Sequence, residues 1–293
     1  MPDTTDRAAP EDVPANPAFD EPPPHPARGF RSNLVKVPTA HLGSAAFNDE
    51  PTALHIAGTR STHAELFGAL ELAVSADEAA TVFQNYMAHR FELSPDFSGR
   101  DGPDGRRRFR ASYLRLLKGW MFDANSTEGA VLKGWVESRF GLMPTYHKGP
   151  LRRLSDERTM AYVEEKLSSR FSNNMIALQL DLLYEFCQWS LHSAWRIVAS
   201  GAHRTLYRGV NDFDEHPILA RPDRRTAVLR LNNLVSFTED RDIAGQFGDH
   251  ILEARVPLVK LLFFRELLPR YPFAGEGEFL VIGGDYRVTV SVL

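Results

Sequence analysis

The sequence predicts an α+β protein, with a mainly helical module in residues 30–200 and a compact, mostly β module in residues 201–293. Two observations lead to this prediction. Between about residues 61 and 200, apolar residues recur at the three- and four-residue spacing of a buried helix face. After Gly201 the apolar runs become short and rich in β-branched and aromatic residues, which is typical of strands.

Two of the expected helix starts carry a hydroxyl residue three positions before a glutamate. Thr62 precedes Glu65 and Ser75 precedes Glu78, and such pairs can cap a first helical turn. Further helices are expected over about 107–122, around Trp135 to Phe140, from Ser155 to about 170, and over about 174–199, with Gly201 as the stop. The longest helix places Cys187 on its apolar face, so we expect this cysteine in the core.

The β module is expected to consist of short strands. The runs are Thr205–Tyr207, Thr226–Leu229, Leu252–Phe264, Phe279–Ile282 and Arg287–Leu293. Gly283-Gly284-Asp285 lies between the last two and predicts a hairpin turn. Residues 34–37 and 54–56 are further candidates for short strands or extended segments.

Composition excludes several classes of protein. A chain of 293 residues with 43% hydrophobic residues and a net charge of −4 is typical of a soluble protein, and its slight acidity argues against a general nucleic-acid binder. No apolar run reaches the ~20 residues of a membrane span. The start of the chain lacks the features of a signal peptide, so we expect a cytoplasmic protein. Residues 1–29 hold many of its prolines and predict a disordered tail.

Two further patterns are set aside. The arginines between Arg106 and Arg110 favour a solvated loop and helix start, with a protein-docking patch as the alternative. Gly275-Glu276-Gly277 is not a dinucleotide fingerprint, because its glutamate would repel phosphate and a strand follows it. The histidines are scattered, and with a single cysteine we expect no metal site.

Three small motifs in the last third of the chain carry chemistry. The first is Arg208, between Tyr207 and Gly209 in a probable strand. A buried arginine needs an anionic partner, which is either an internal acid or the phosphate oxygens of a ligand. Gly209 would let a ligand approach the backbone.

The second motif is Ser236-Phe237-Thr238. In a strand the two hydroxyls point to one side and Phe237 to the other. Taken alone, the motif favours a strand edge followed by a helix cap at Thr238.

The third motif is Glu276-Gly277-Glu278, which places two carboxylates on one side of an extended segment. Such a pair lies on a solvated edge or at a site that uses it. Beside an arginine that binds phosphate, one carboxylate suits stabilisation of a sugar carbon that becomes positive, and the other suits orientation of a nucleophile.

In this order, the three motifs resemble the Arg–Ser–Glu class of mono-ADP-ribosyltransferases. The helical module, with runs such as Phe30–Leu34, Leu54–Arg60 and Leu178–Trp195, is similar to the NAD-dependent dinitrogenase reductase ADP-ribosyltransferases of nitrogen-fixing bacteria. The resemblance implies that residues 201–293 form a split β-sandwich with NAD in its cleft. NAD would be a consumed substrate, and no metal is implied.

The resemblance also implies a role for each motif residue. Arg208 would bind the NAD phosphates, and Ser236, supported by Thr238, would hold the catalytic Glu278. Glu278 would stabilise the cation formed as nicotinamide leaves. Glu276 would orient an arginine of the acceptor protein. The remaining residues expected around NAD are Tyr207, Gly209, Phe237 and Phe247.

The implied acceptor is an arginine of dinitrogenase reductase, the iron protein of nitrogenase, and the implied regulator is a PII-type nitrogen-signalling protein. The helical module is our candidate for both contacts. One alternative is an arginine ADP-ribosyltransferase or NAD glycohydrolase with another acceptor. Two others are a non-catalytic NAD-binding regulatory module and a helical scaffold that does not bind NAD.

Overall fold

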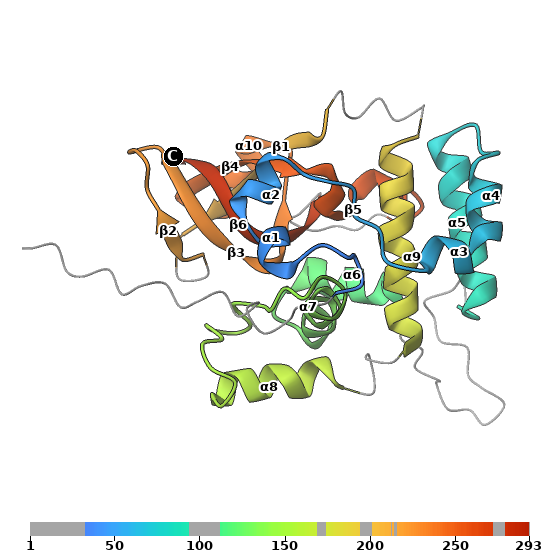
Figure 1. Cartoon of the computed structure of the whole chain (residues 1–293), viewed down its shortest axis with the longest axis horizontal. Helices are drawn as coiled ribbons and strands as arrows, with labels where there is room; N and C mark the ends of the chain where they lie inside the picture. The colour runs from blue at the N-terminus through green and yellow to red at the C-terminus, as the bar shows by residue number, and fades with distance from the viewer. Residues whose placement is uncertain are drawn as a thin grey trace, which may run out of the picture.

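The computed structural model describes residues 33–93, 112–168, 174–193, 201–211, 213, 216–271 and 279–292. The predictions for the tail at 1–29 and for the run Arg106–Arg110 lie outside these residues. Within the described residues, helices come first along the chain and an antiparallel sheet follows (Figure 1). The fold is therefore α+β.

Ten α-helices are found among the described residues. They are α1 (Thr39–Leu42), α2 (Ala45–Asp49), α3 (Thr59–Thr62), α4 (Ala64–Leu70), α5 (Ala76–Arg90), α6 (Tyr113–Phe122), α7 (Thr127–Phe140), α8 (Glu157–Lys166), α9 (Asn174–Leu191) and α10 (Arg241–Gly245). The strands are β1 (His203–Val210), β2 (Ile218–Ala220), β3 (Thr226–Phe237), β4 (His250–Pro257), β5 (Leu261–Phe264) and β6 (Phe279–Val292). Residues 34–37 and 54–56 form no strand, and none of the described helices is long and apolar enough to cross a membrane.

One of the two predicted helix caps is confirmed. The Ser75 hydroxyl accepts the Glu78 backbone N–H at 3.2 Å, and the Glu78 carboxylate accepts the Val74 N–H at 2.9 Å, which closes the first turn of α5. The predicted cap at Thr62 is wrong. Thr62 is the last residue of α3, so its backbone is already helical, and α4 begins after His63 without a side-chain cap.

Helix α9 lies between β5 and the helices α3 to α5 (Figure 1). It is buried on nearly every side rather than along one stripe, and Cys187 is fully buried as predicted. Buried polar groups bond it to the sheet: the Tyr184 hydroxyl donates to the Val259 carbonyl at 2.8 Å, and Gln188 Nε2 donates to the Leu258 and Leu261 carbonyls. The helix ends at Leu191, before the stop predicted at Gly201, and residues 192 and 193 are no longer helical.

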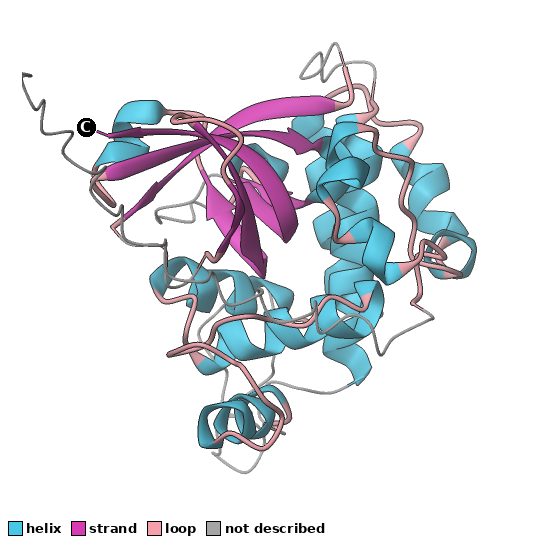
Figure 2. Cartoon of the chain, turned by 60° about the vertical axis from the view of Figure 1, so that its left-hand side comes forward, coloured by secondary structure: helices cyan, strands magenta, loops and turns pink. Residues whose placement is uncertain are grey.

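The strands form one antiparallel sheet in the order β1-β4-β6-β3-β2, and β5 also pairs with β6. Long β6 pairs with β3 along most of its length, with β4 near its end and with β5 near its start. An isolated bridge joins Tyr207 of β1 to Thr238, just after β3, so the first and fourth strands of the path also meet. The sheet is therefore strongly curved, with helices packed below and beside it (Figure 2).

The predicted hairpin turn at Gly283-Gly284-Asp285 is wrong, because β6 runs straight through these residues. Gly284 pairs with Leu231 and Asp285 with Arg230, just before a shift in the register of β3 between Leu231 and Leu234. A Cβ atom on Gly283 would lie 1.6 Å from the Asn232 carbonyl oxygen. Gly283 thus permits close approach of β3 to β6, and Gly284 permits close approach of the backbone at Gly43, so neither glycine reverses the chain.

We expect Gly283→Ala to lower the free energy of unfolding by about 1–3 kcal/mol, because the added methyl group overlaps a backbone atom of β3 that cannot move without breaking the ladder. Gly68→Ala is the matched control. No atom lies within 4 Å of the new methyl group in α4, so this helical substitution should raise stability by about 0.5–1 kcal/mol. Denaturant unfolding measures both, and equal stability of the two variants would contradict the close packing of β3 on β6.

The helices and the sheet share one hydrophobic core. A continuous cluster of buried residues extends from Val35 in the first described segment to Val288 in β6. Helix α2 packs on β4 and β6, and α9 packs on β5. The proposed division into a helical module and a β core remains a prediction, and the two parts are closely packed on each other.

Candidate functional site

The bridge between Tyr207 and Thr238 brings two of the sequence motifs together. Each residue donates its backbone N–H to the carbonyl of the other, at 2.7 and 2.9 Å. Arg208 follows Tyr207, and its Nη1 donates to the Ser236 carbonyl at 3.0 Å. Its Nε donates to His216 Nε2 at 3.2 Å, and because a guanidinium can only donate, that imidazole nitrogen is the acceptor.

A cavity of about 390 Å³ opens at this junction. Its wall includes all seven described residues for which the sequence predicts a role in binding NAD, namely Tyr207, Arg208, Gly209, Ser236, Phe237, Thr238 and Phe247. Residues 120–125, at and after the end of α6, form the opposite wall. The geometry therefore gathers the predicted residues at one place, and their individual roles remain predictions.

Trp120 is the residue on the helical wall that sequence reasoning missed. Its ring is buried, and its indole N–H donates to the Ser236 hydroxyl at 2.9 Å. Lys133 lies 5.7 Å from the centre of the same ring. Among the described residues, Trp120 is the hydrogen-bond partner of the Ser236 side chain, so the helical region fixes the serine of the motif. No spacing rule links these two positions, which lie far apart in sequence.

Helix α10 packs tightly on the strand that carries Arg208. A Cβ atom on Gly209 would lie 2.0 Å from the Ala244 carbonyl oxygen, so this glycine is required for the packing of α10 on β1 as well as lining the cavity. Thr238 was expected to cap this helix, but Asp240 does so, since its carboxylate accepts the N–H groups of Asp242 and Ile243. The Thr238 hydroxyl instead accepts the Asp240 N–H at 3.1 Å.

The two glutamates of the third motif, Glu276 and Glu278, lie outside the described residues. Phe279, the residue that follows Glu278 in the chain, begins β6 and pairs with Phe237 of the second motif. The sheet register therefore places the residue that follows the third motif beside the second motif. The positions and roles of the two carboxylates remain predictions.

A second cavity, of about 420 Å³, adjoins the first, and Arg208, Gly209 and Phe247 line both. Its other residues come from β1 and the loop after it, and from a loop and helix of the helical region: Tyr146, Lys148, Gly149, Pro150, Arg158, Val210, Asn211 and His216. The two cavities form the two arms of one cleft, which we call the Arg208 cleft, between the sheet and the helical region.

The loop at residues 145–150 borders the second arm and is firmly held. Tyr146 pairs with Pro150, and its carbonyl accepts Lys133 Nζ at 3.0 Å and Asn232 Nδ2 at 2.8 Å. Lys148 has a positive φ of 55°, uncommon for a residue with a side chain, and its Nζ pairs with Glu165 at 2.5 Å. Burial raises the pKa of Glu165, but hydrogen bonds from Lys148 and His147 outweigh this effect and lower it.

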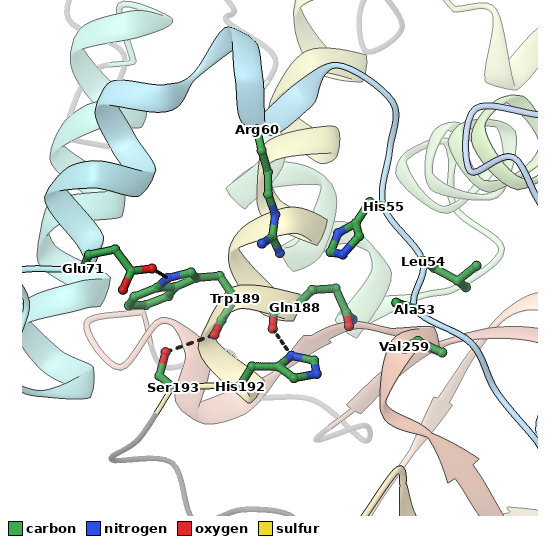
Figure 3. A pocket seen from close by; sticks show the side chains of 10 residues that line it. All are labelled: Ala53, Leu54, His55, Arg60, Glu71, Gln188, Trp189, His192, Ser193 and Val259. Atoms are coloured by element: carbon green, nitrogen blue, oxygen red, sulfur yellow. Dashed lines mark hydrogen bonds between the residues drawn. The ribbon is translucent and has the colours of Figure 1, made fainter.

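A larger cavity of about 620 Å³ lies elsewhere, between the segment at 53–60 and the end of α9 (Figure 3). It contains none of the motif residues. Fully buried Glu185 accepts the Ile56 N–H and Arg60 Nε, both at 2.6 Å, while Glu71 accepts the Trp189 indole N–H. The bonds of Glu185 attach the segment at 54–60 to α9, and the bond of Glu71 attaches the end of α4 to it. Size alone does not identify the site, and we take the Arg208 cleft as the candidate because the sequence motifs converge there.

The described residues hold no group of three or more histidine, cysteine, aspartate or glutamate side chains arranged to bind a metal ion. The first arm of the cleft presents a guanidinium, a carboxylate, hydroxyls and aromatic rings. Trp120, Tyr207, Phe237 and Phe247 can contact planar rings, and Arg208 can bind phosphate oxygens. A substrate with two ring systems joined by a diphosphate fits this arrangement.

Comparison with known proteins agrees with this geometry. The family model described as dinitrogenase reductase ADP-ribosyltransferase matches residues 32–290. A curated relative from Rhodospirillum rubrum, named NAD(+)–dinitrogen-reductase ADP-D-ribosyltransferase, is 52% identical over 271 residues, which cover 92% of this chain and 97% of the relative. No solved structure matches the chain. The match over nearly the whole length shows that this chain belongs to the dinitrogenase reductase ADP-ribosyltransferase family.

Proposed function

We propose that this protein transfers ADP-ribose from NAD to an arginine side chain of dinitrogenase reductase and thereby inactivates that enzyme. The supporting observation is the convergence of Tyr207–Gly209, Ser236–Thr238 and Phe247 on one cleft, in a chain 52% identical to a transferase named for this reaction. Inactivation would follow because an attached anionic ADP-ribose blocks docking of the electron-transfer partner. The protein would thus regulate nitrogen fixation.

The reaction exchanges one C–N bond for another. The bond between nicotinamide and the ribose carbon breaks, a bond from that carbon to a guanidine nitrogen forms, and a proton leaves the guanidinium. Arg208 binds the diphosphate, which fixes the ribose. Ser236 positions Glu278, whose carboxylate stabilises the positive ribose as nicotinamide leaves. Glu276 orients the acceptor arginine and assists its deprotonation.

Three finer features belong to the same proposal. The curved sheet, closed by the bridge from Tyr207 to Thr238, supports a split β-sandwich with NAD in its cleft. We propose a PII-type protein as regulator, with the helical region as the candidate contact surface for regulator and acceptor. A cytoplasmic location follows from the implied acceptor.

Label transfer tests the function. The purified protein is mixed with NAD labelled in its adenylate half and with dinitrogenase reductase, with and without a PII protein. The expected result is label on an acceptor arginine, absent with a Glu278→Gln variant. Release of free nicotinamide without labelled protein would support cleavage of NAD by this protein and would rule out dinitrogenase reductase as its acceptor. Neither product in either mixture would indicate a non-catalytic NAD-binding module.

Trp120→Phe tests whether the helical wall takes part in catalysis. Phenylalanine keeps an aromatic ring but loses the N–H that donates to the Ser236 hydroxyl at 2.9 Å. Since one hydrogen bond contributes about 0.5–1.5 kcal/mol, we expect kcat for nicotinamide release to fall about two- to tenfold with a nearly unchanged KM for NAD. Steady-state kinetics of nicotinamide release measures both constants.

Ser236→Ala and the double variant with Trp120→Phe provide the control. If Trp120 acts through the serine, the double variant should be no slower than Ser236→Ala alone. If the losses in kcat of the two single variants add in the double variant, Trp120 contributes to catalysis other than through Ser236.

A further inference from the structure

The two arms of the Arg208 cleft differ in charge. The first arm has aromatic side chains, and its charged residues are Arg208 and the exposed Asp123. The second arm has Lys148 and Arg158 in addition to Arg208. A ligand with an anionic half and a neutral or cationic half would therefore be oriented by the cleft, with its anionic half in the second arm.

Arg158 is the most informative cation of the second arm. Among the described residues it makes no ion pair and no hydrogen bond, whereas neighbouring Lys148 is paired with Glu165 at 2.5 Å. Arg158 lies in the first turn of α8, where the helix dipole disfavours a positive charge. Arg158 is exposed and follows Asp156 and Glu157 in sequence, but neither acid is paired with it, so its donors are available to an anion in the cavity.

The backbone beneath Arg158 is shaped for its side chain. A Cβ atom on Gly149 would lie 2.7 Å from Arg158 Nη1 and 3.1 Å from its Cζ, so the guanidinium rests directly on this glycine. The preceding residue, Lys148, has a positive φ, and its N–H donates to Asn125 Oδ1 at 3.1 Å. A strained loop that hydrogen bonds hold in place is typical of a functional site.

We propose that the second arm binds the ADP half of NAD and that Arg158 is a second arginine that binds its phosphates, supplied by the helical region opposite Arg208. This inference rests on the proposed function. It places the nicotinamide half in the first arm, beside Ser236, and leaves that arm open to the acceptor. A cationic acceptor arginine would be repelled by the second arm and would enter on the side of Asp123.

Binding of ADP and nicotinamide tests the assignment, because each represents one half of NAD. We expect Arg158→Gln to raise the Kd for ADP at least ~10-fold, since a charge-assisted hydrogen bond is lost, and to leave inhibition by nicotinamide unchanged. Arg158→Lys should restore part of the ADP affinity, because a lysine supplies the charge but not the planar fork. Isothermal titration with ADP and product inhibition by nicotinamide measure these effects on the full chain.

Arg153→Gln is the matched control, because Arg153 is an exposed arginine of the same segment that lies outside the cavity wall. It should leave both affinities unchanged. Equal ADP binding by the wild type and Arg158→Gln, with loss in Arg208→Lys, would overturn the role of Arg158 and leave the proposed function intact. A parallel loss of ADP and nicotinamide affinity would show a general distortion of the cleft and would also overturn it. Absence of NAD and ADP binding to the wild type would reject the proposed function itself.

Discussion

Glu278→Gln is expected to lower all NAD cleavage at least ~10²-fold, in transfer and in hydrolysis alike. The amide keeps the shape of the carboxylate but not its charge, so it cannot stabilise the positive ribose in the transition state. The residue after it, Phe279, begins β6 and pairs with Phe237 of the second motif. Nicotinamide release with and without dinitrogenase reductase measures the two activities.

Glu276→Gln is the matched variant, two residues away. It should spare hydrolysis of NAD and lose transfer to arginine, because only transfer needs a carboxylate that orients the acceptor guanidinium. Equal loss of both activities in both variants would defeat this division of roles. Retention of full hydrolysis by Glu278→Gln would remove Glu278 from the catalytic site.

Arg208→Lys is expected to raise the KM for NAD by about 10- to 100-fold. Arg208 donates through Nε to His216 and through Nη1 to the Ser236 carbonyl, which fixes the plane of its guanidinium at the junction of the two arms. Lysine has a single charged nitrogen and cannot keep both bonds while it binds phosphate oxygens. Loss of charge-assisted bonds worth about 1.5–3 kcal/mol gives the expected range. Steady-state kinetics at varied NAD concentration measures it.

Arg230→Lys separates binding from packing. Arg230 lies on β3 outside the cleft wall and forms a two-point pair with Asp285, at 2.8 and 3.3 Å. Its replacement should lower the temperature of unfolding and leave the KM for NAD unchanged. If Arg208→Lys also lowers the temperature of unfolding and leaves the KM for NAD unchanged, Arg208 is a structural link between β1 and β3. The sequence leaves this alternative open, because a buried arginine can also have an internal partner.

The fold class was predictable because helix and strand periodicities are local properties of a sequence. Gly283-Gly284 shows where local reasoning fails. A glycine pair before an aspartate is typical of a turn, but here Gly283 permits β3 to approach β6 closely, and that need arises from a strand about fifty residues earlier. The short helices α1 and α2 were also missed, since they are too short to show a period and are stabilised by packing on the sheet.

The candidate site was predictable to the extent that its residues lie in short motifs. Arg208 and Ser236 were identified from their neighbours in sequence, and the bridge from Tyr207 to Thr238 brings them together. Trp120 and Arg158 were not identified. They belong to helices whose sequences explain them fully as a core residue and a surface residue, and only the packing of the helical region against the sheet brings them to the walls of the cleft.

The hydrogen bonds between α9 and the strand region bear on how this protein can be divided. A fragment that begins at residue 201 would contain every motif residue, yet it would lack Trp120 and would leave the carbonyls of Leu258 and Leu261 without their partner Gln188. The apolar side chains of β5, now covered by α9, would face water. The smallest part of the chain suited to crystallisation or to the transfer of this activity into another protein therefore begins near residue 33, ahead of the first helices that pack on the sheet.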